Sequence, residues 1–264
     1  MKLKNKVIIV TASTRGIGLA AVEACAKEGA NVYMAARNLE AAKETADRLN
    51  SEGYHVKCIY HDAGNPESYA TMAKEVALDA GRIDVLVNNF GTSDPKRDRD
   101  IENTDAEVFL DTVTLNLRSV FLASKEALNY MRTSGGSIIN ISSVGGAVPD
   151  VSQIAYGTSK AAINYLTKLI AVHEAANRIR CNAILPGMTA TDAVQTKLTE
   201  EFKGLFLKHV PLGRMGLPEE IAAAVVYFAS DDAAYTTGQI LTVAGGFGMA
   251  TPVYGDLRNK TDKR

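Results

Sequence analysis

Short apolar runs alternate with amphipathic segments along almost the whole chain. The run at 7–10, VIIV, is apolar at every position, which is typical of a strand buried on both faces of a parallel sheet. The segment at 16–29 repeats apolar residues at helical spacing and ends at a glycine, which is typical of a helix. The same reasoning predicts strands at 6–12, 30–37, 55–62, 83–89, 136–143, 179–187 and 239–243, and helices at 16–29, 38–53, 65–81, 104–132, 154–176, 199–208 and 218–229.

The strict alternation of strands and helices predicts an α/β fold. We expect a doubly wound, mostly parallel Rossmann sheet of about seven strands with helices on both faces. No linker rich in proline or serine divides the chain, so residues 1–250 are predicted to form a single domain. The tail at 251–264 is polar and is expected to be frayed. Loops are expected at 92–103 and 186–198.

Composition narrows the classes of function. The 264 residues are 46% hydrophobic and carry a net charge of −1, whereas surfaces that bind nucleic acids are basic. No stretch approaches the 18 apolar residues of a membrane helix, and the apolar run near the N-terminus is too short for a signal peptide. The three cysteines and four histidines lack the spacing of a disulfide framework or a metal site. We therefore expect a cytoplasmic protein with no nucleic-acid partner, no membrane partner and no metal.

Residues 10–18, VTASTRGIG, connect the first predicted strand to the first predicted helix. The free N–H groups of a helix N-terminus bind a pyrophosphate if the turn lets the phosphate approach closely. Gly16 and Gly18 allow this approach, but Ala12 stands where such turns usually have their first glycine. We expect Ala12 to serve there only with a negative φ. Glycine pairs also occur as plain packing contacts, so the turn alone is weak evidence.

The second predicted strand indicates which dinucleotide is bound. Folds that bind NAD place an acidic residue about 20 positions after the turn, where it bonds the ribose 2′-hydroxyl. Here Ala36 takes that position and Arg37 follows it. Arg37 and Arg15 are expected to converge on a 2′-phosphate, whose oxygens match the guanidinium fork. The alternative is a solvated arginine at a strand end. We predict NADP rather than NAD.

A second motif, YGTSK at 156–160, predicts proton transfer. Tyr156 and Lys160 lie four residues apart on a predicted helix and therefore share a face. A phenol has an ordinary pKa of about 10, which a neighbouring ammonium lowers. Ser143 lies at the end of a predicted strand, where ligands bind in such sheets, and its hydroxyl is expected to hold a substrate oxygen beside Tyr156. The Tyr-x-x-x-Lys spacing is common on surfaces, but together with the glycine turn it becomes specific.

These motifs together resemble the short-chain dehydrogenase/reductase family of the classical type, from about residue 4 to 250. The resemblance implies hydride transfer between NADP(H) and a secondary alcohol or its ketone, without a metal. It depends on TASTRGIG (11–18), Asp62, NNFG (88–91), Asn116, Ser143, Tyr156, Lys160, RCNAILPG (180–187) and TTGQILTVAGG (236–246). The chain departs from the family pattern at Ala12, at Phe90 and at Ala244.

The resemblance also implies a role for each residue. Tyr156 would be the general acid/base, Lys160 would bind the nicotinamide ribose and lower the phenol pKa, and Ser143 would polarise the substrate oxygen. Asn116 would hold a water that relays protons from Lys160. The implied cofactor contacts are Thr11, Ser13, Thr14, Arg15, Gly16, Ile17, Gly18, Arg37, Asp62, Ala63, Asn89, Phe90, Gly91, Tyr156, Lys160, Pro186, Gly187 and Thr189.

Within the family, NNFGTSD (88–94) and VAGGFGMATPVYGD (243–256) are similar to stretches of bacterial NADP-dependent enzymes that act on the 7α-hydroxyl of steroids. This implies bile acids as substrates, an apolar lid at 188–210 and a homotetramer built on the helices at 104–132 and 154–176. The lid segment has a simpler alternative, namely packing on the core. A reductase for another carbonyl, such as a 3-oxoacyl thioester, is the second enzyme hypothesis. A cofactor-sensing protein without chemistry is the third, although such proteins usually lack the tyrosine or the lysine.

Overall fold

The computed structural model describes residues 1–251 and 253–261. Seven strands in this part of the chain form one parallel sheet in the order β3-β2-β1-β4-β5-β6-β7. The strands are β1 (Val7–Thr11), β2 (Asn31–Ala36), β3 (His55–Tyr60), β4 (Val85–Asn88), β5 (Gly136–Ile141), β6 (Ile179–Pro186) and β7 (Ile240–Val243). The strand order reverses between β1 and β4, which is where ligands bind in open α/β sheets. The predicted fold class is confirmed.

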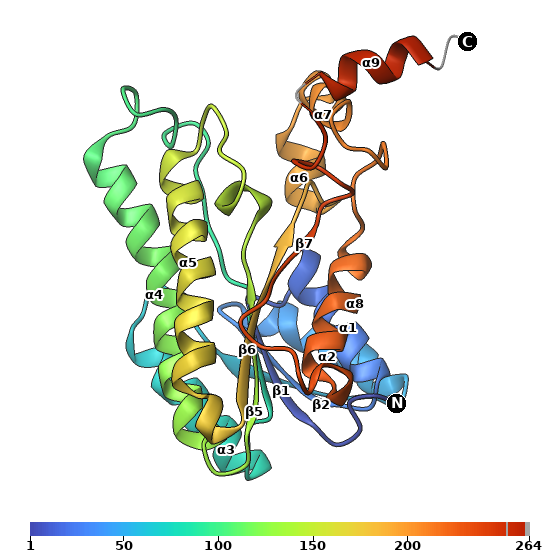
Figure 1. Ribbon diagram of the computed structural model, residues 1–264. Helices are drawn as coiled ribbons and strands as arrows, with labels where there is room; N and C mark the ends of the chain where they lie inside the picture. Colours follow the sequence, from blue (N-terminus) through green and yellow to red (C-terminus); the bar gives the residue numbers. More distant parts are fainter. Residues whose placement is uncertain (252, 262–264) are drawn as a thin grey trace.

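Helices cover both faces of the sheet (Figure 1). On one face lie α3 (Glu67–Ala80), α4 (Ala106–Met131) and α5 (Ile154–His173), and on the other lie α1 (Gly16–Lys27), α2 (Leu39–Ser51) and α8 (Pro218–Ala229). The shorter helices α6 (Asp192–Lys197), α7 (Glu200–Leu207) and α9 (Tyr254–Thr261) lie beyond the carboxyl ends of the strands. Three 3-10 turns complete the chain, namely η1 (Val144–Gly146), η2 (Ala175–Asn177) and η3 (Asp231–Ala233).

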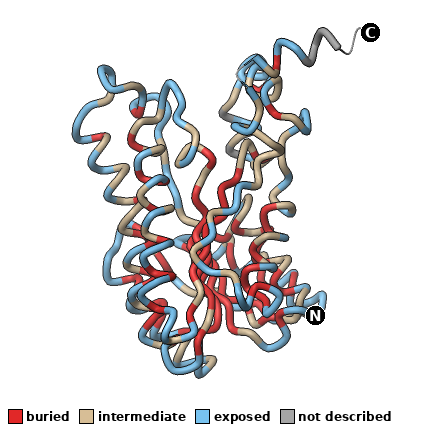
Figure 2. The backbone as a smooth tube through the Cα atoms, viewed as in Figure 1, coloured by how far each residue is buried: buried red, intermediate tan, exposed pale blue. Residues whose placement is uncertain are grey.

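Two apolar cores lie on opposite faces of the sheet. Neighbouring residues of β1 point to different cores, since Ile8 packs with α1, α2 and α8 while Ile9 packs with α3, α4 and α5. This is the alternation expected of an extended strand. Figure 2 shows the buried residues gathered around the sheet, with exposed segments above its carboxyl edge. The residues that stand above this edge are therefore held by loops and helix ends rather than by the cores.

Two helices appear where none is predicted. α6 lies in the predicted loop 186–198, and the hydroxyl of Thr191 caps it by accepting a hydrogen bond from the N–H of Val194 at 3.4 Å. α9 lies in the tail that is predicted to be frayed, where Asp256 pairs with Lys208 and Gly255 lies close to Lys208. The expectation of a frayed tail is wrong for residues 254–261, and residues 262–264 lie outside the described residues. Both helices are short, and the contacts of α9 with Lys208 come from a distant part of the chain.

None of the helices within residues 1–251 and 253–261 is long and apolar enough to cross a membrane.

Candidate active site

A cavity of about 210 Å³ lies at the carboxyl ends of β4, β5 and β6. It brings together three of the four predicted catalytic residues, Ser143, Tyr156 and Lys160. Its lining is Ile17, Asn89, Gly91, Ile141, Ser142, Ser143, Tyr156, Lys160, Pro186, Gly187, Met188, Thr189, Thr191 and Val194. The predicted site residues that do not line it are Thr11, Ser13, Thr14, Arg15, Gly16, Gly18, Arg37, Asp62, Ala63, Phe90 and Asn116.

The turn after β1 has a left-handed residue where a negative φ was expected. Ala12 has a φ of 52°, so that expectation is wrong. Asn89, at the end of β4, stabilises the turn. Its Nδ2 donates to the carbonyls of Thr11 at 3.2 Å and of Ala12 at 3.0 Å, while its own N–H donates to the Thr11 hydroxyl at 2.9 Å. These bonds hold Ala12 in a conformation that costs an L-residue roughly 1–2 kcal/mol.

The two glycines of the turn leave no room for a side chain. A β-carbon at Gly18 would lie 2.5 Å from Nδ2 of Asn89 and 2.6 Å from the carbonyl oxygen of Ala12, and Gly16 has a φ of 56°. Arg15, the N-cap of α1, provides no side-chain bond to the first turn of the helix. The first N–H groups of α1 are therefore open to a ligand. The hydroxyl of Ser13 is fully buried and has no partner among the described residues, so the turn fits a bound phosphate.

The residues predicted to contact the adenosine half of the cofactor follow β1, β2 and β3. Arg15 and Arg37 are exposed, and neither guanidinium bonds a side chain or carbonyl within the described part of the chain. Asp62 accepts a hydrogen bond from the N–H of Gly64 at 2.9 Å. The carbonyl of Ala63 accepts from the hydroxyl of Tyr69 at 3.0 Å. The carboxyl edge of these three neighbouring strands thus presents two unpaired cations and one carboxylate.

Lys160 is buried, with 2% of its side chain exposed. Its Nζ donates to the carbonyl oxygen of Ile141 at 2.9 Å and lies 5.5 Å from the centroid of the Tyr156 ring. Burial lowers the pKa of Lys160 to about 8, because an ammonium is poorly solvated there. A β-carbon at Gly91 would lie 2.8 Å from this Nζ, so a larger residue at position 91 would displace the ammonium from its observed position.

Tyr156 shares the cavity with Ser143. Burial raises the pKa of Tyr156 above its ordinary value, and a hydrogen bond with the Ser143 hydroxyl opposes that rise. The expected lowering of the phenol pKa by Lys160 is therefore not found, because burial is the main influence on this pKa and raises it. The Ser143 hydroxyl also accepts a hydrogen bond from the N–H of Gly145 at 3.1 Å. This bond orients the hydroxyl at the start of η1, beside the phenol.

Asn116 is buried in the middle of α4, and its side chain is fully used. Its Oδ1 accepts from the N–H of Thr92 at 2.8 Å, and its Nδ2 donates to the Thr92 carbonyl at 2.9 Å and to the Ser159 hydroxyl at 3.0 Å. Both amide hydrogens are therefore occupied. The Ser119 hydroxyl donates to the main-chain carbonyl of Asn116 at 2.8 Å, an oxygen that also serves as an acceptor within the helix.

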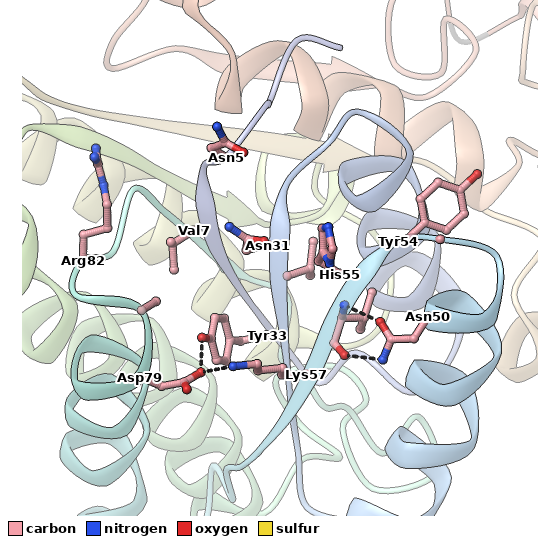
Figure 3. A pocket seen from close by; sticks show the side chains of 14 residues that line it. Asn5, Val7, Asn31, Tyr33, Asn50, Tyr54, His55, Lys57, Asp79 and Arg82 are labelled. Atoms are coloured by element: carbon pink, nitrogen blue, oxygen red, sulfur yellow. Dashed lines mark hydrogen bonds and ion pairs between the residues drawn. The ribbon is translucent and has the colours of Figure 1, made fainter.

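A larger hollow, of about 690 Å³, lies at the opposite edge of the sheet, where β1, β2 and β3 begin (Figure 3). Several of its polar side chains are already hydrogen-bonded. Asp79 joins the ammonium of Lys57, at 2.6 Å, to the hydroxyl of Tyr33, and Asn50 makes two hydrogen bonds with the backbone of Val56. None of the predicted site residues lines this hollow.

Sequence reasoning missed three groups near the cavity. The carbonyl of Ile141 receives the Lys160 ammonium, and a main-chain acceptor leaves no mark in a sequence. Thr191 lies against Gly16, with its Cγ2 3.2 Å from where a β-carbon at that position would be. Asp98 bonds the backbone of Tyr156. The pattern Thr-Asp at 191–192 is a recognisable helix start, but Asp98 lies in a stretch of mixed charge that gave no such signal.

Comparison with known proteins places this site in a family. The family model described as enoyl-(acyl carrier protein) reductase matches residues 11–248. The solved structure of a short-chain type dehydrogenase/reductase from Mycobacterium marinum superposes with a TM-score of 0.88 and 32% identity, covering 94% of this chain and 98% of that one. The chain belongs to the short-chain dehydrogenase/reductase family. Enzymes of this family use a nicotinamide cofactor, either NAD or NADP.

Relatives within the short-chain dehydrogenase/reductase family differ in their similarity to this chain. A 7alpha-hydroxysteroid dehydrogenase of Clostridium sardiniense is 49% identical over 256 residues, covering 97% of this chain and 98% of its own length. A 3-oxoacyl-[acyl-carrier-protein] reductase of Vibrio cholerae is 37% identical over 250 residues, covering 94% of this chain and all of its own length. The family assignment confirms the predicted oxidoreductase class.

Proposed function

We propose that this protein transfers a hydride between NADP(H) and the C7 position of bile acids, interconverting the 7α-hydroxyl and the ketone. The assignment to hydride transfer between an alcohol and its ketone is supported above all by one cavity. In it the hydroxyls of Ser143 and Tyr156 lie beside the buried Lys160. The choice of substrate is supported by 49% identity, over nearly the full length, to an enzyme named for that reaction.

The proposed cofactor is NADP. When bound, its nicotinamide supplies or accepts the hydride. The N–H groups at the start of α1 and the Ser13 hydroxyl would hold its pyrophosphate, and the unpaired guanidiniums of Arg15 and Arg37 support a 2′-phosphate rather than a 2′-hydroxyl. Asp62 and Ala63 would contact the adenine, while the segment from Pro186 to Thr189 would lie along the nicotinamide. The remaining proposed contacts are Thr11, Thr14, Ile17, Asn89, Phe90, Gly91, Tyr156 and Lys160.

In this proposal, the side chains of Tyr156, Ser143 and Lys160 manage the proton that leaves or joins the substrate oxygen. During oxidation Tyr156 removes the proton of the substrate hydroxyl while the Ser143 hydroxyl holds the same oxygen in place. Burial raises the phenol pKa, so any stabilisation of the phenolate by the Lys160 ammonium would have to act against that rise. Lys160 then passes the proton towards solvent by way of a water held by Asn116. During reduction the same groups act in the opposite direction.

The surroundings of the cavity support an apolar substrate. Met188 and Val194, which belong to the lid segment, line it, and Phe202 and Leu205 of α7 are 46% and 59% exposed. A flat steroid would cover such side chains. Apolar residues are also exposed on α4 and α5, among them Phe121 and Tyr165, which supports the proposed homotetramer built on these helices. The three free cysteines support a location in the reducing cytoplasm.

The first experiment measures NADP⁺ reduction with cholate and with deoxycholate, which lacks the 7-hydroxyl. Turnover of cholate alone is expected, and the variant Tyr156→Phe should abolish it. Equal turnover of both would move the reaction to another ring position. Turnover of neither, combined with NADPH-dependent reduction of an acetoacetyl thioester, would favour the second candidate, a 3-oxoacyl reductase, which the 37% identity to such an enzyme keeps open.

A further inference from the structure

The loop between β4 and α4 contains a single buried residue. Asp98 has none of its side chain exposed, whereas the other residues of 91–103 are exposed or half-buried. A buried carboxylate is costly unless hydrogen-bond donors surround it. The donors for Asp98 come from another element, the first turn of α5. Its Oδ1 accepts from the N–H of Ala155 at 2.9 Å and its Oδ2 accepts from the N–H of Tyr156 at 2.9 Å.

The start of α5 cannot be capped by its own sequence. Gln153, the residue before the helix, has a left-handed backbone with φ of 61° and ψ of 46° and makes no side-chain cap, whereas an N-cap residue normally has an extended backbone. The first N–H groups of the helix therefore need other partners. The N–H of Ile154 donates to the carbonyl of Arg99 at 3.1 Å, and the next two N–H groups donate to Asp98. All three partners lie in the one loop.

The same loop is anchored at its other end to the centre of the site. Thr92 makes two hydrogen bonds with the side chain of Asn116 on α4, and the hydroxyl of Ser93 donates to Oε1 of Gln153 at 2.8 Å. Asn116 in turn bonds the hydroxyl of Ser159, one turn further along α5. The position of Asp98 is thus determined by bonds that run from α4 through the loop to α5.

We propose that Asp98 is a positioning residue for the reaction, which rests on the proposed function of Tyr156 as the general acid/base. Its carboxylate fixes the N–H of Tyr156 itself, at the start of a helix that places Lys160 one turn later. Without it the first turn of α5 loosens, and the phenol no longer stays within reach of both the Ser143 hydroxyl and the substrate oxygen. A displacement of about 1 Å at a reacting group costs on the order of 100-fold in rate.

The test compares Asp98→Asn with Asp100→Asn. The first variant keeps the size of the side chain but offers one of the two N–H groups an amide donor instead of an acceptor. The second removes a carboxylate whose bonds to Glu102 and Asn103 stay within the same loop. Asp98→Asn is expected to lower kcat about 10- to 100-fold with the Kd of NADPH within about twofold, because most of the proposed cofactor contacts, the glycine turn among them, lie outside α5. Asp100→Asn is expected to leave both the kcat and the Kd of NADPH unchanged.

Two results would overturn the proposal. One is a kcat of Asp98→Asn within about twofold of the parent enzyme. The other is a parallel loss of kcat, NADPH affinity and Tm, which would indicate general unfolding. If Asp98→Asn does not fold, Asp98→Ser retains one short acceptor and should show the same separation of kcat from cofactor affinity.

A measurement without substrate separates this proposal from the proposed function. Amide hydrogen exchange at Ala155 and Tyr156 is expected to be faster in Asp98→Asn than in Asp100→Asn, whichever substrate the enzyme takes. If exchange at both amides were unchanged, the proposal that Asp98 caps the first turn of α5 would be refuted. Inactivity of the parent enzyme on bile acids would refute only the choice of substrate.

Discussion

Replacing Ala12 by glycine should make the protein more stable. The φ of 52° at this position costs an alanine roughly 1–2 kcal/mol, and glycine has no such cost. Glycine loses about 0.5–1 kcal/mol more backbone entropy on folding. The difference leaves a net gain of about 0.5–1 kcal/mol. The bond from Nδ2 of Asn89 goes to the main-chain carbonyl of residue 12, so the variant keeps it.

Thermal unfolding without cofactor measures this gain. For a chain of this size, 1 kcal/mol corresponds to about 2–4 °C in Tm, so Ala12→Gly should raise the Tm by about 1–4 °C. Ala70→Gly is the matched control, since Ala70 is an exposed residue inside α3. There glycine should lower stability by about 1 kcal/mol.

The two variants should therefore shift the Tm in opposite directions. A fall in Tm for Ala12→Gly as large as that for Ala70→Gly would refute the argument, because it would mean that the left-handed turn carries no strain. The Kd of the cofactor should stay unchanged or become slightly lower, since the turn is already in the conformation that glycine prefers. A higher Kd would contradict the proposal that this turn binds the cofactor's pyrophosphate.

Three further predictions concern the site. Gly91→Ala would place a β-carbon 2.8 Å from Nζ of Lys160 and displace the ammonium from the Ile141 carbonyl, so kcat/KM should fall at least about tenfold with the protein still folded by circular dichroism. Arg37→Glu should raise the KM for NADP⁺ about 10- to 100-fold and leave that for NAD⁺ nearly unchanged; equal effects on both would exclude a 2′-phosphate contact. Because the pKa of Lys160 is lowered from 10.5 to about 8, burial of this lysine costs stability below pH 8, and the cost disappears as the pH rises to 10.5. Lys160→Met should therefore be more stable than the parent by up to about 3 kcal/mol at pH 7, and urea unfolding should show the difference shrinking between pH 8 and 10.5.

The regular elements were predictable because their signals are local. Asn38 at the start of α2 accepts hydrogen bonds from the N–H groups of Glu40 and Ala41, and Gly53 after its end has a φ of 91°. Both follow from residue type alone. The inner strands were predictable because both faces of the sheet are covered, which makes runs such as that of β1 apolar at nearly every position.

Features that depend on distant partners were not predictable. The backbone of Ala12 is set by Asn89, which lies 77 residues away. The first turn of α5 is capped from 57 and 58 residues away, by Asp98. The pKa of Tyr156 was expected to fall on the strength of its spacing from Lys160, but burial determines it, and burial comes from the assembled cavity. In each case the sequence shows the residue type, but the distances and the burial that determine its role arise only in the folded chain.

The hollow at the amino edge of the sheet has a practical consequence for ligand screening. At about 690 Å³ it is larger than the cavity of about 210 Å³ that contains Tyr156. A small fragment that binds the protein without cofactor can therefore lie in the hollow between Tyr33, His55 and Arg82 instead of in the catalytic cavity. Such compounds would raise the melting temperature without inhibiting turnover. Competition with NADPH, rather than thermal stabilisation, is the criterion that selects inhibitors of this enzyme.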